Sequence, residues 1–160
     1  MSKYVVADSS CLIVLSKIGK LEILREIFER IYIPEAVFYE VVDLGKGRVG
    51  AQAIKKADWI ECVTVENSVK IRQLNLDAGE TEAIALASEK QADFIILDDR
   101  RARKAAFKLS LPVIGTIAVL KKAEEKHLVT DLPAILEDMA KVGFHFSLKK
   151  MGQSVAVQTQ

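Results

Sequence analysis

Cysteine is scarce in this chain of 160 residues, in which only Cys11 and Cys62 occur. Neither belongs to a Cys-x-x-Cys motif, and neither has a histidine near it in the sequence. This spacing argues against both a disulfide framework and a zinc site. Because isolated thiols are typical of proteins in a reducing compartment, we expect a cytoplasmic location.

Long apolar runs are also missing. No uninterrupted apolar stretch approaches the roughly 18 residues that a membrane-spanning helix needs. The N-terminal segment reaches the charged Asp8 before the apolar core of a signal peptide could form. We therefore expect neither export nor a membrane span.

The chain lacks an excess of charge of either sign and is poor in aromatic residues. Its formal net charge is +1, so any contact with nucleic acid must come from a local patch. Aromatic residues make up 6% of the chain, which gives little basis for stacking of exposed bases. Hydrophobic residues make up 50% and charged residues 28%, as in an ordinary globular protein.

Short β-branched runs alternate with helical patterns along the chain. The clearest strand patterns cover residues 4–7, 31–33, 59–65, 94–97 and 113–114. Helical patterns cover residues 11–18, 21–28, 35–42, 49–56, 77–88, 100–109, 116–126 and 131–142, and more ambiguously 69–74. Residues 45–48 read as a loop. This alternation predicts a three-layer α/β/α domain around a mainly parallel sheet, with residues 1–150 as a single domain and residues 151–160 as a loose tail.

Acidic residues follow two of the predicted strands. Asp8 comes directly after the first strand, and Asp98 and Asp99 come directly after the strand at 94–97. In an open parallel sheet, ligands bind at the carboxyl ends of the strands. A second interpretation stays open for each position, since aspartate also caps helices and forms turns. Ser9 or Ser10 could cap the first helix without a charge.

Four glutamates are further candidates. Glu40 lies on the helix predicted at 35–42, where the alternative is a solvated surface residue, and Glu35 is more simply a partner of the helix dipole. Glu80 and Glu82 open the helix predicted at 77–88, where acidic residues are also favourable for stability. Two residues apart on a helix, they point about 200° from each other, so we do not expect them to serve a site equally.

The helix that follows Asp98 is strongly basic, and two or three of its cationic side chains could face a phosphate backbone. A solvated basic helix is the alternative. Arg103 lies one turn beyond Asp99 and is the first candidate for contacting substrate phosphate or orienting an acid. The basic residues are Arg100, Arg101, Arg103, Lys104 and Lys108.

Five short motifs in order resemble those of the PIN-domain nucleases, and especially the small prokaryotic toxin-like branch that is often paired with an antitoxin (VapC-like). The resemblance covers residues 4–130. Its motifs are Val-Val-Ala-Asp-Ser-Ser at 5–10, Ile-Pro at 33–34 through Glu-Val at 40–41, Gly-Glu-Thr-Glu-Ala at 79–83, Leu-Asp-Asp-Arg at 97–100 with Arg103, and Val-Ile-Gly-Thr at 113–116 leading to Leu120.

The resemblance implies a set of metal-binding carboxylates. It assigns metal binding and catalysis to Asp8, Glu40, Glu80 and Asp98. Glu80 is preferred over Glu82 because its spacing to Ala87 matches the family. The resemblance makes Asp99 an outer or water-mediated ligand, and Ser10 and Glu82 supporting residues. Two positions depart from the family pattern: Asp99 replaces a common glutamate, and His127 stands where relatives commonly turn on glycine.

These residue types suit Mg²⁺ or Mn²⁺, because hard oxygen ligands bind these ions and a cation offsets the repulsion between carboxylates. The resemblance therefore implies a metal-dependent ribonuclease that hydrolyses RNA phosphodiester bonds. The position of the basic helix directly after Asp98 predicts Arg103, Arg100 and Lys104 near the substrate. The resemblance also implies a possible role as the toxin of a toxin–antitoxin pair.

Alternatives to a nuclease stay open. A receiver-like phosphoacceptor also has acids at strand ends, but the Asp98–Asp99 pair lies too late in the chain for that arrangement. A non-catalytic PIN-like interaction or RNA-binding module would keep the fold without cleavage. A homodimer is a further hypothesis, based on the wealth of apolar residues in the first two helices: Leu12, Leu15, Leu21, Leu24 and Ile27.

Overall fold

The computed structural model describes residues 3–44, 50–66 and 75–144. The strands are β1 (Val5–Ala7), β2 (Ile31–Pro34), β3 (Ile60–Val63), β4 (Phe94–Ile96) and β5 (Val113–Ile114). The helices are α1 (Ser9–Lys17), α2 (Glu22–Phe28), α3 (Glu35–Phe38), η1 (Tyr39–Asp43), α4 (Ala51–Lys56), α5 (Ala78–Glu89), α6 (Arg100–Lys108), α7 (Thr116–Glu125) and α8 (Leu132–Lys141). The predicted loop at 45–48, the ambiguous helix at 69–74 and the predicted tail at 151–160 lie outside the described residues.

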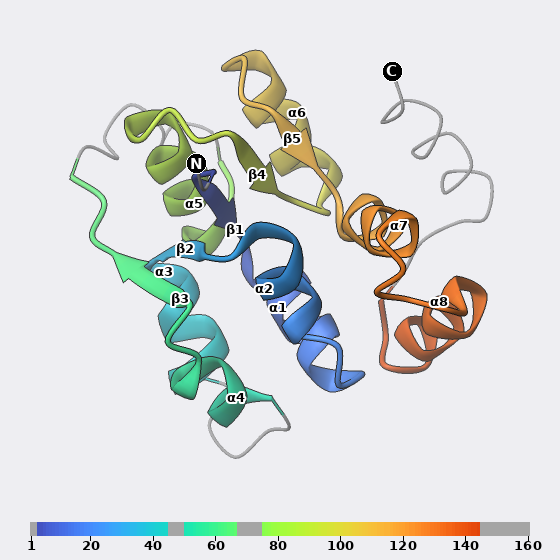
Figure 1. The fold of residues 1–160 in the computed structure, drawn as a ribbon. Helices are drawn as coiled ribbons and strands as arrows, with labels where there is room; N and C mark the ends of the chain where they lie inside the picture. Colours follow the sequence, from blue (N-terminus) through green and yellow to red (C-terminus); the bar gives the residue numbers. More distant parts are fainter. Residues whose placement is uncertain (1–2, 45–49, 67–74, 145–160) are drawn as a thin grey trace.

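The five strands form one sheet in the order β3-β2-β1-β4-β5, and every described pairing is parallel. The central strand β1 pairs with β4 through Val5, Val6 and Ala7, opposite Phe94, Ile95 and Ile96. Helices cover both faces of the sheet (Figure 1). The predicted three-layer α/β/α architecture is therefore confirmed.

Alternating side chains on the strands divide the core into two layers. Val5 and Ala7 of β1 face a cluster formed mainly with α1, α2, α7 and α8. Val6 faces the opposite cluster, formed with α5 and α6. This alternation follows from the two-residue period of a strand, and burial on both faces explains why the central strand β1 is apolar throughout.

The register of β1 against β4 brings two acids to one edge of the sheet. Asp8 follows β1, and its backbone N–H donates to the carbonyl of Ile96 at 3.1 Å. Asp98 follows Ile96, the last residue of the neighbouring strand β4, by two residues. Both side chains therefore leave the sheet at its carboxyl edge, where the sequence predicted them.

The helix predicted at 35–42 is present, but its hydrogen bonding changes in the middle. Residues from Tyr39 onward form the π-helical turn η1, and the N–H of Leu44 donates to the carbonyl of Tyr39 at 2.9 Å. A wider turn of this kind is rare and is frequently found at functional sites. It carries Glu40.

Two interpretations of the N-terminal region were wrong in detail. Ser9 and Ser10 do not cap α1, because both lie in its first turn and Asp8 occupies the N-cap position. The reason given for a homodimer also fails, since Leu12, Leu15, Leu21 and Leu24 are buried in the core of the single chain. No helix in the described ranges is long and apolar enough to cross a membrane.

Candidate active site

Asp8 is the most buried acid of the candidate site, with 4% of its surface exposed. Although it occupies the N-cap position of α1, its side chain makes no capping hydrogen bond. Its Oδ1 atom is buried and has no hydrogen-bond partner among the residues that the structure describes. Burial raises the pKa of Asp8 to about 7, and repulsion from Asp77, Glu40 and Asp98 adds to this rise while the Ser9 backbone N–H opposes it. A buried carboxylate oxygen without a partner is costly unless a proton or a cation accompanies it.

Glu40 reaches Asp8 from the π-helical turn. The Ser9 hydroxyl donates to Glu40 Oε1 at 2.5 Å, which leaves Oε2 outside this bond. A Cβ atom added to Gly79 would lie 3.0 Å from Glu40 Oε2 and 3.5 Å from Asp8 Oδ1. Gly79 therefore leaves open the space at which these two oxygens converge, and a solvated surface role for Glu40 does not describe its surroundings.

Glu80 joins the same group from the first turn of α5. Burial raises its pKa to about 7, and repulsion from Asp77, Asp99 and Asp8 adds to the rise. Glu82 lies elsewhere, because its carboxylate accepts a 3.2 Å hydrogen bond from the backbone N–H of Ala36 at the start of α3. Glu80 is thus under the electrostatic influence of the acidic group, whereas Glu82 supports the helix that leads to Glu40.

Asp98 is held by three donors. The Thr116 backbone N–H donates to Oδ1 at 2.8 Å, and the Thr116 and Ser10 hydroxyls donate to Oδ2 at 2.5 and 3.2 Å. Donors on two different helices fix the orientation of this carboxylate. Asp99 has another task, since its Oδ2 accepts from the Ala102 N–H at 2.9 Å and caps α6.

The basic residues of α6 have separate surroundings. Arg103 is half-buried, donates from Nη1 to the Leu97 carbonyl at 3.2 Å, and lies beside Gly115 close to Asp98. Arg101 donates to the Asn75 carbonyl at 3.0 Å. Arg100 and Lys104 are exposed. Arg103 therefore holds the segment that carries Asp98 at the end of β4, while Arg100 and Lys104 face solvent.

The acidic group fits a hard divalent cation. Its donors are carboxylate and hydroxyl oxygens, and the unpartnered Oδ1 of Asp8 is the kind of atom that a cation would satisfy. Within residues 3–44, 50–66 and 75–144, no three acidic, cysteine or histidine side chains already surround a common point at which a metal ion could bind. The acids are thus gathered in one region, and side-chain rotation would be needed to bring three of them to one ion.

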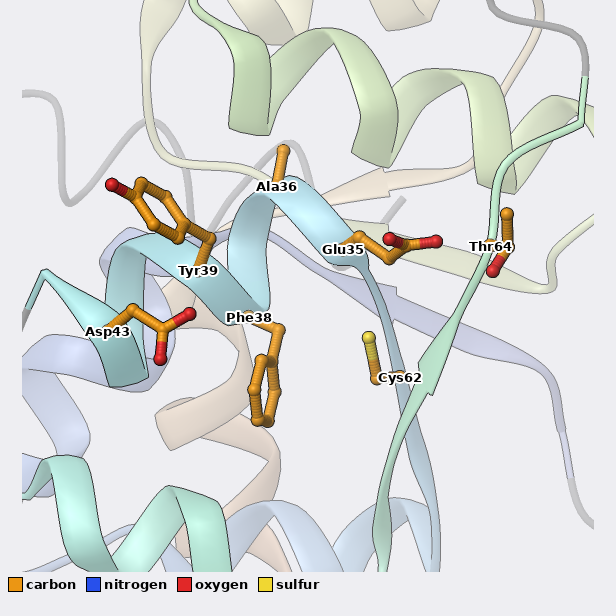
Figure 2. Close-up of a pocket in the computed structure, with 7 residues that line it drawn as sticks. All are labelled: Glu35, Ala36, Phe38, Tyr39, Asp43, Cys62 and Thr64. Carbon is orange, nitrogen blue, oxygen red and sulfur yellow. The ribbon is translucent and has the colours of Figure 1, made fainter.

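A hollow of about 610 Å³ lies away from this group, between the α3–η1 segment and the β3 side of the sheet (Figure 2). Its lining includes Glu35, Tyr39 and Cys62 but none of the four acids proposed for metal binding. Burial raises the pKa of the Cys62 thiol, with repulsion from Glu35 and Glu82 adding to it. The Cys62 thiol therefore stays protonated at neutral pH and is a poor nucleophile there.

The sequence patterns did not predict the roles of three residues of the site, which are Asp77, Ser9 and Thr116. Asp77 caps α5 by accepting from the Glu80 N–H at 2.8 Å and acts electrostatically on Asp8 and Glu80. The position of Asp77, two residues before Gly79 in the acidic helix motif, could have indicated that it belongs to the site. Ser9 and Thr116 were noticed only as a helix cap and as part of a Gly-Thr motif, because their partners lie 31 and 18 residues away.

Comparison with known proteins adds one match. A family model described as a PIN domain matches residues 4–157. No curated protein matches the chain. The matched range includes every residue of the acidic group.

Proposed function

The chain belongs to the PIN-domain family, and from this membership we propose that it is a divalent-metal-dependent endoribonuclease that hydrolyses RNA phosphodiester bonds. PIN domains are generally nucleases, so the family indicates a hydrolase of nucleic acid. The observation that carries the finer proposal is the buried, unpartnered Oδ1 of Asp8 among further carboxylates at the carboxyl edge of the sheet.

We assign Asp8, Glu40, Glu80 and Asp98 as the ligands of Mg²⁺ or Mn²⁺, with Asp99 as an outer ligand. Such an ion would supply a water activated at neutral pH and would offset charge on the phosphate oxygens. No histidine, serine or cysteine nucleophile is then required. The electrostatic effect of Asp8 and Asp99 on Glu80 supports it over Glu82 as the fourth acid.

The other polar residues of the site position these acids. Ser9 holds Glu40, and Ser10 and Thr116 hold Asp98, so these two carboxylates each have a fixed donor before substrate arrives. Glu82 fixes the start of α3, on the segment that continues to Glu40. Groups oriented in advance leave less rearrangement for the reaction, so the rotation that brings three acids to one ion would fall to Asp8 and Glu80.

Substrate phosphates would bind next to Asp98. Arg103 places its guanidinium beside Gly115, and Arg100 and Lys104 are exposed on the helix that starts at Asp99. Cations at this position neutralise phosphates and orient the strand. We propose these three residues as the substrate-binding group.

Cleavage of a labelled single-stranded RNA tests the proposal. Purified protein is expected to cleave with Mn²⁺ or Mg²⁺ and to stop when the metal is chelated. Asp8→Asn and Asp98→Asn should each lower the rate by about a thousand-fold, the order of effect that electrostatic groups in an active site have. Asp131→Asn is the matched control, because Asp131 caps α8 and asparagine caps helices equally well.

Two results would contradict the proposal. Cleavage that survives both substitutions would show that these acids do not carry it. RNA binding without cleavage in any divalent metal would favour the alternative of a non-catalytic RNA-binding module.

We further propose that the protein is a cytoplasmic homodimer and the toxin of a toxin–antitoxin pair. Cys11 and Cys62 are free thiols, which supports a reducing compartment. Tyr39 and Leu44, 54% and 58% exposed, offer apolar contact area for a second copy or an antitoxin. Light scattering at micromolar concentration tests the dimer, and growth arrest on expression that a neighbouring gene relieves tests the toxin.

A further inference from the structure

The outward face of α6 carries an exposed aromatic ring among cationic side chains. Phe107 is 78% exposed, more than any other large hydrophobic residue in the described part of the chain. Ala102 and Ala106 are buried and fix which side of α6 faces the core. Arg100, Lys104 and Lys108 are exposed and, with Phe107, lie within about 100° of the helix circumference. We call these four residues the α6 face.

The α6 face stands out electrostatically from the rest of the chain. The helix contains five cationic residues and no acidic one. Of the 23 cationic and 22 acidic residues in the whole chain, 18 and 22 lie elsewhere, so the remainder has a net charge of −4. Helix α6 thus has a net charge of +5 while the rest of the chain is net negative, and local binding of a polyanion requires such an excess of positive charge.

The α6 face also starts at the candidate active site. Asp99 caps α6, directly after Asp98, and the helix then runs away from the acids. From Arg100 to Lys108 the face is about 12 Å long. Within the described residues, Arg100, Lys104 and Lys108 make no hydrogen bond or ion pair that would occupy their charges.

We propose that the α6 face binds single-stranded RNA, with a base stacked on Phe107 and phosphates contacting Arg100, Lys104 and Lys108. This inference rests on the proposed function, because it extends the substrate path beyond the reacting phosphate. Base stacking on aromatic rings beside a cationic groove is the usual mode of single-strand binding. The low aromatic content of the chain gave little basis for expecting stacking, and the exposed ring of Phe107 supplies one.

The charges favour RNA over a protein as the occupant. The centre of a protein interface is poor in lysine, whereas two of the four residues of the α6 face are lysines that flank Phe107. Lysine beside an aromatic ring matches the alternation of phosphate and base along a nucleic acid strand. A second copy of the chain is tested as the competing occupant.

Binding is measured by fluorescence anisotropy in the presence of a chelator, so that no cleavage occurs. The probes are a labelled single-stranded RNA and an oligonucleotide of equal length that lacks its bases. Phe107→Ala should weaken binding of the RNA about five-fold to one-hundred-fold and leave binding of the abasic strand unchanged. Phe107→Tyr should restore binding because it keeps an aromatic face.

Two controls separate stacking from other effects. Leu128→Ala removes a different exposed apolar side chain, 38% exposed, and should leave binding unchanged. Lys104→Ala and Lys108→Ala should weaken both probes and make the salt dependence less steep, whereas Lys141→Ala on α8 should not. Phe107→Ala is expected to fold, since it changes an exposed helical position to the best helix former.

The outcomes are distinguishable from those of the proposed function. Equal RNA binding by Phe107→Ala and wild type would overturn the stacking proposal, even if wild type cleaves RNA. A wild-type dimer that Phe107→Ala dissociates would overturn it in favour of a contact between copies. Phe107-dependent binding by a protein that never cleaves would support the α6 face while contradicting the nuclease.

Discussion

The Ser9 hydroxyl donates a 2.5 Å hydrogen bond to Glu40 Oε1 and so joins the first turn of α1 to the π-helical turn η1. Ser9 is buried, with 6% of its surface exposed. A serine in this position removes water from one oxygen of Glu40 and replaces it with a single fixed donor. The wide turn at Tyr39–Asp43 and this bond together aim the other oxygen toward Gly79 and Asp8.

Loss of the Ser9 hydroxyl should therefore impair activity more than stability. We expect Ser9→Ala to lower the cleavage rate about ten-fold to one-hundred-fold at limiting metal, the usual cost of losing a residue that orients a metal ligand. Ser9→Thr should recover much of the loss. Ser16→Ala is the control, because Ser16 is a buried serine of the same helix whose hydroxyl donates only to the Leu12 carbonyl. Equal rates for Ser9→Ala and Ser16→Ala would contradict a positioning role.

Thr116 should have the corresponding role for Asp98. Thr116→Val keeps the shape of the buried side chain but removes the hydroxyl that donates to Oδ2, so we expect a loss of activity of about ten-fold or more. Thr116→Ser should stay close to wild type. Thr81→Val, which changes a buried threonine bound to the Leu76 carbonyl, provides the control. Steady-state cleavage rates of the three variants decide the point.

The sheet and the strand-end acids could be predicted from the sequence because both depend on local patterns. Apolar β-branched runs identified β1 and β4, and their parallel pairing brings Asp8 and Asp98 to one edge. Glu40 and Glu80 needed the family resemblance. Their helical positions alone fitted a solvated surface or a favourable helix end equally well.

The remaining parts of the site depend on contacts between distant segments. The shift from α3 to the π-helical η1 has no simple sequence signature, yet it carries Glu40. The hydroxyls of Ser9 and Ser10 bond to carboxylates rather than to their own helix, so a local capping rule assigned them wrongly. Phe107 was one of six phenylalanines in the sequence, and only the packing of Ala102 and Ala106 shows that it faces outward.

Stability should depend on pH through Asp8 and Glu80. Both acids have pKa values raised to about 7 by burial and by neighbouring carboxylates. The folded protein then holds protons that the unfolded chain releases near pH 4, so without divalent metal the free energy of unfolding should fall as pH rises from about 4 to 7. For Asp8 alone the fall is on the order of 4 kcal/mol at most.

Asp8→Asn removes this charge and should raise the free energy of unfolding above that of wild type at pH 8, with little difference near pH 4. Chemical denaturation at the two pH values, in chelator, measures both. Asp131→Asn, which keeps the α8 cap, should show no such gain. A gain from Asp8→Asn that is equal at both pH values would refute the electrostatic cause.

Binding of a divalent metal should offset the repulsion between these carboxylates and so raise the free energy of unfolding at neutral pH. At about one hundred times its dissociation constant, Mg²⁺ or Mn²⁺ adds about 2.7 kcal/mol to the stability of a protein that binds it only when folded. For a domain of this size that corresponds to a rise in Tm of about 5–10 °C. Asp8→Asn should remove most of this rise, and Asp131→Asn should keep it. An equal rise in all three proteins would indicate binding outside the acidic group.

Substitution of Gly79 should distinguish an effect on the metal site from an effect on the stability of the fold. In a helix, Gly→Ala gains about 1 kcal/mol, so Gly79→Ala should not destabilise α5 on propensity alone. The added Cβ would nevertheless lie 3.0 Å from Glu40 Oε2 and 3.5 Å from Asp8 Oδ1, in the space where the two oxygens converge. We therefore expect Gly79→Ala to keep its Tm in chelator while losing most of its metal-induced stabilisation and its cleavage activity.

The matched control is the neighbouring exposed residue of the same helix. Ala78→Gly should lower stability by up to about 1 kcal/mol and keep the response to metal, the reverse of Gly79→Ala. Calorimetry with and without Mn²⁺ compares the two variants directly. If Gly79→Ala bound Mn²⁺ as wild type does, the point of convergence beside Gly79 could not be the metal position, and the ligand set would have to centre on Asp98 instead.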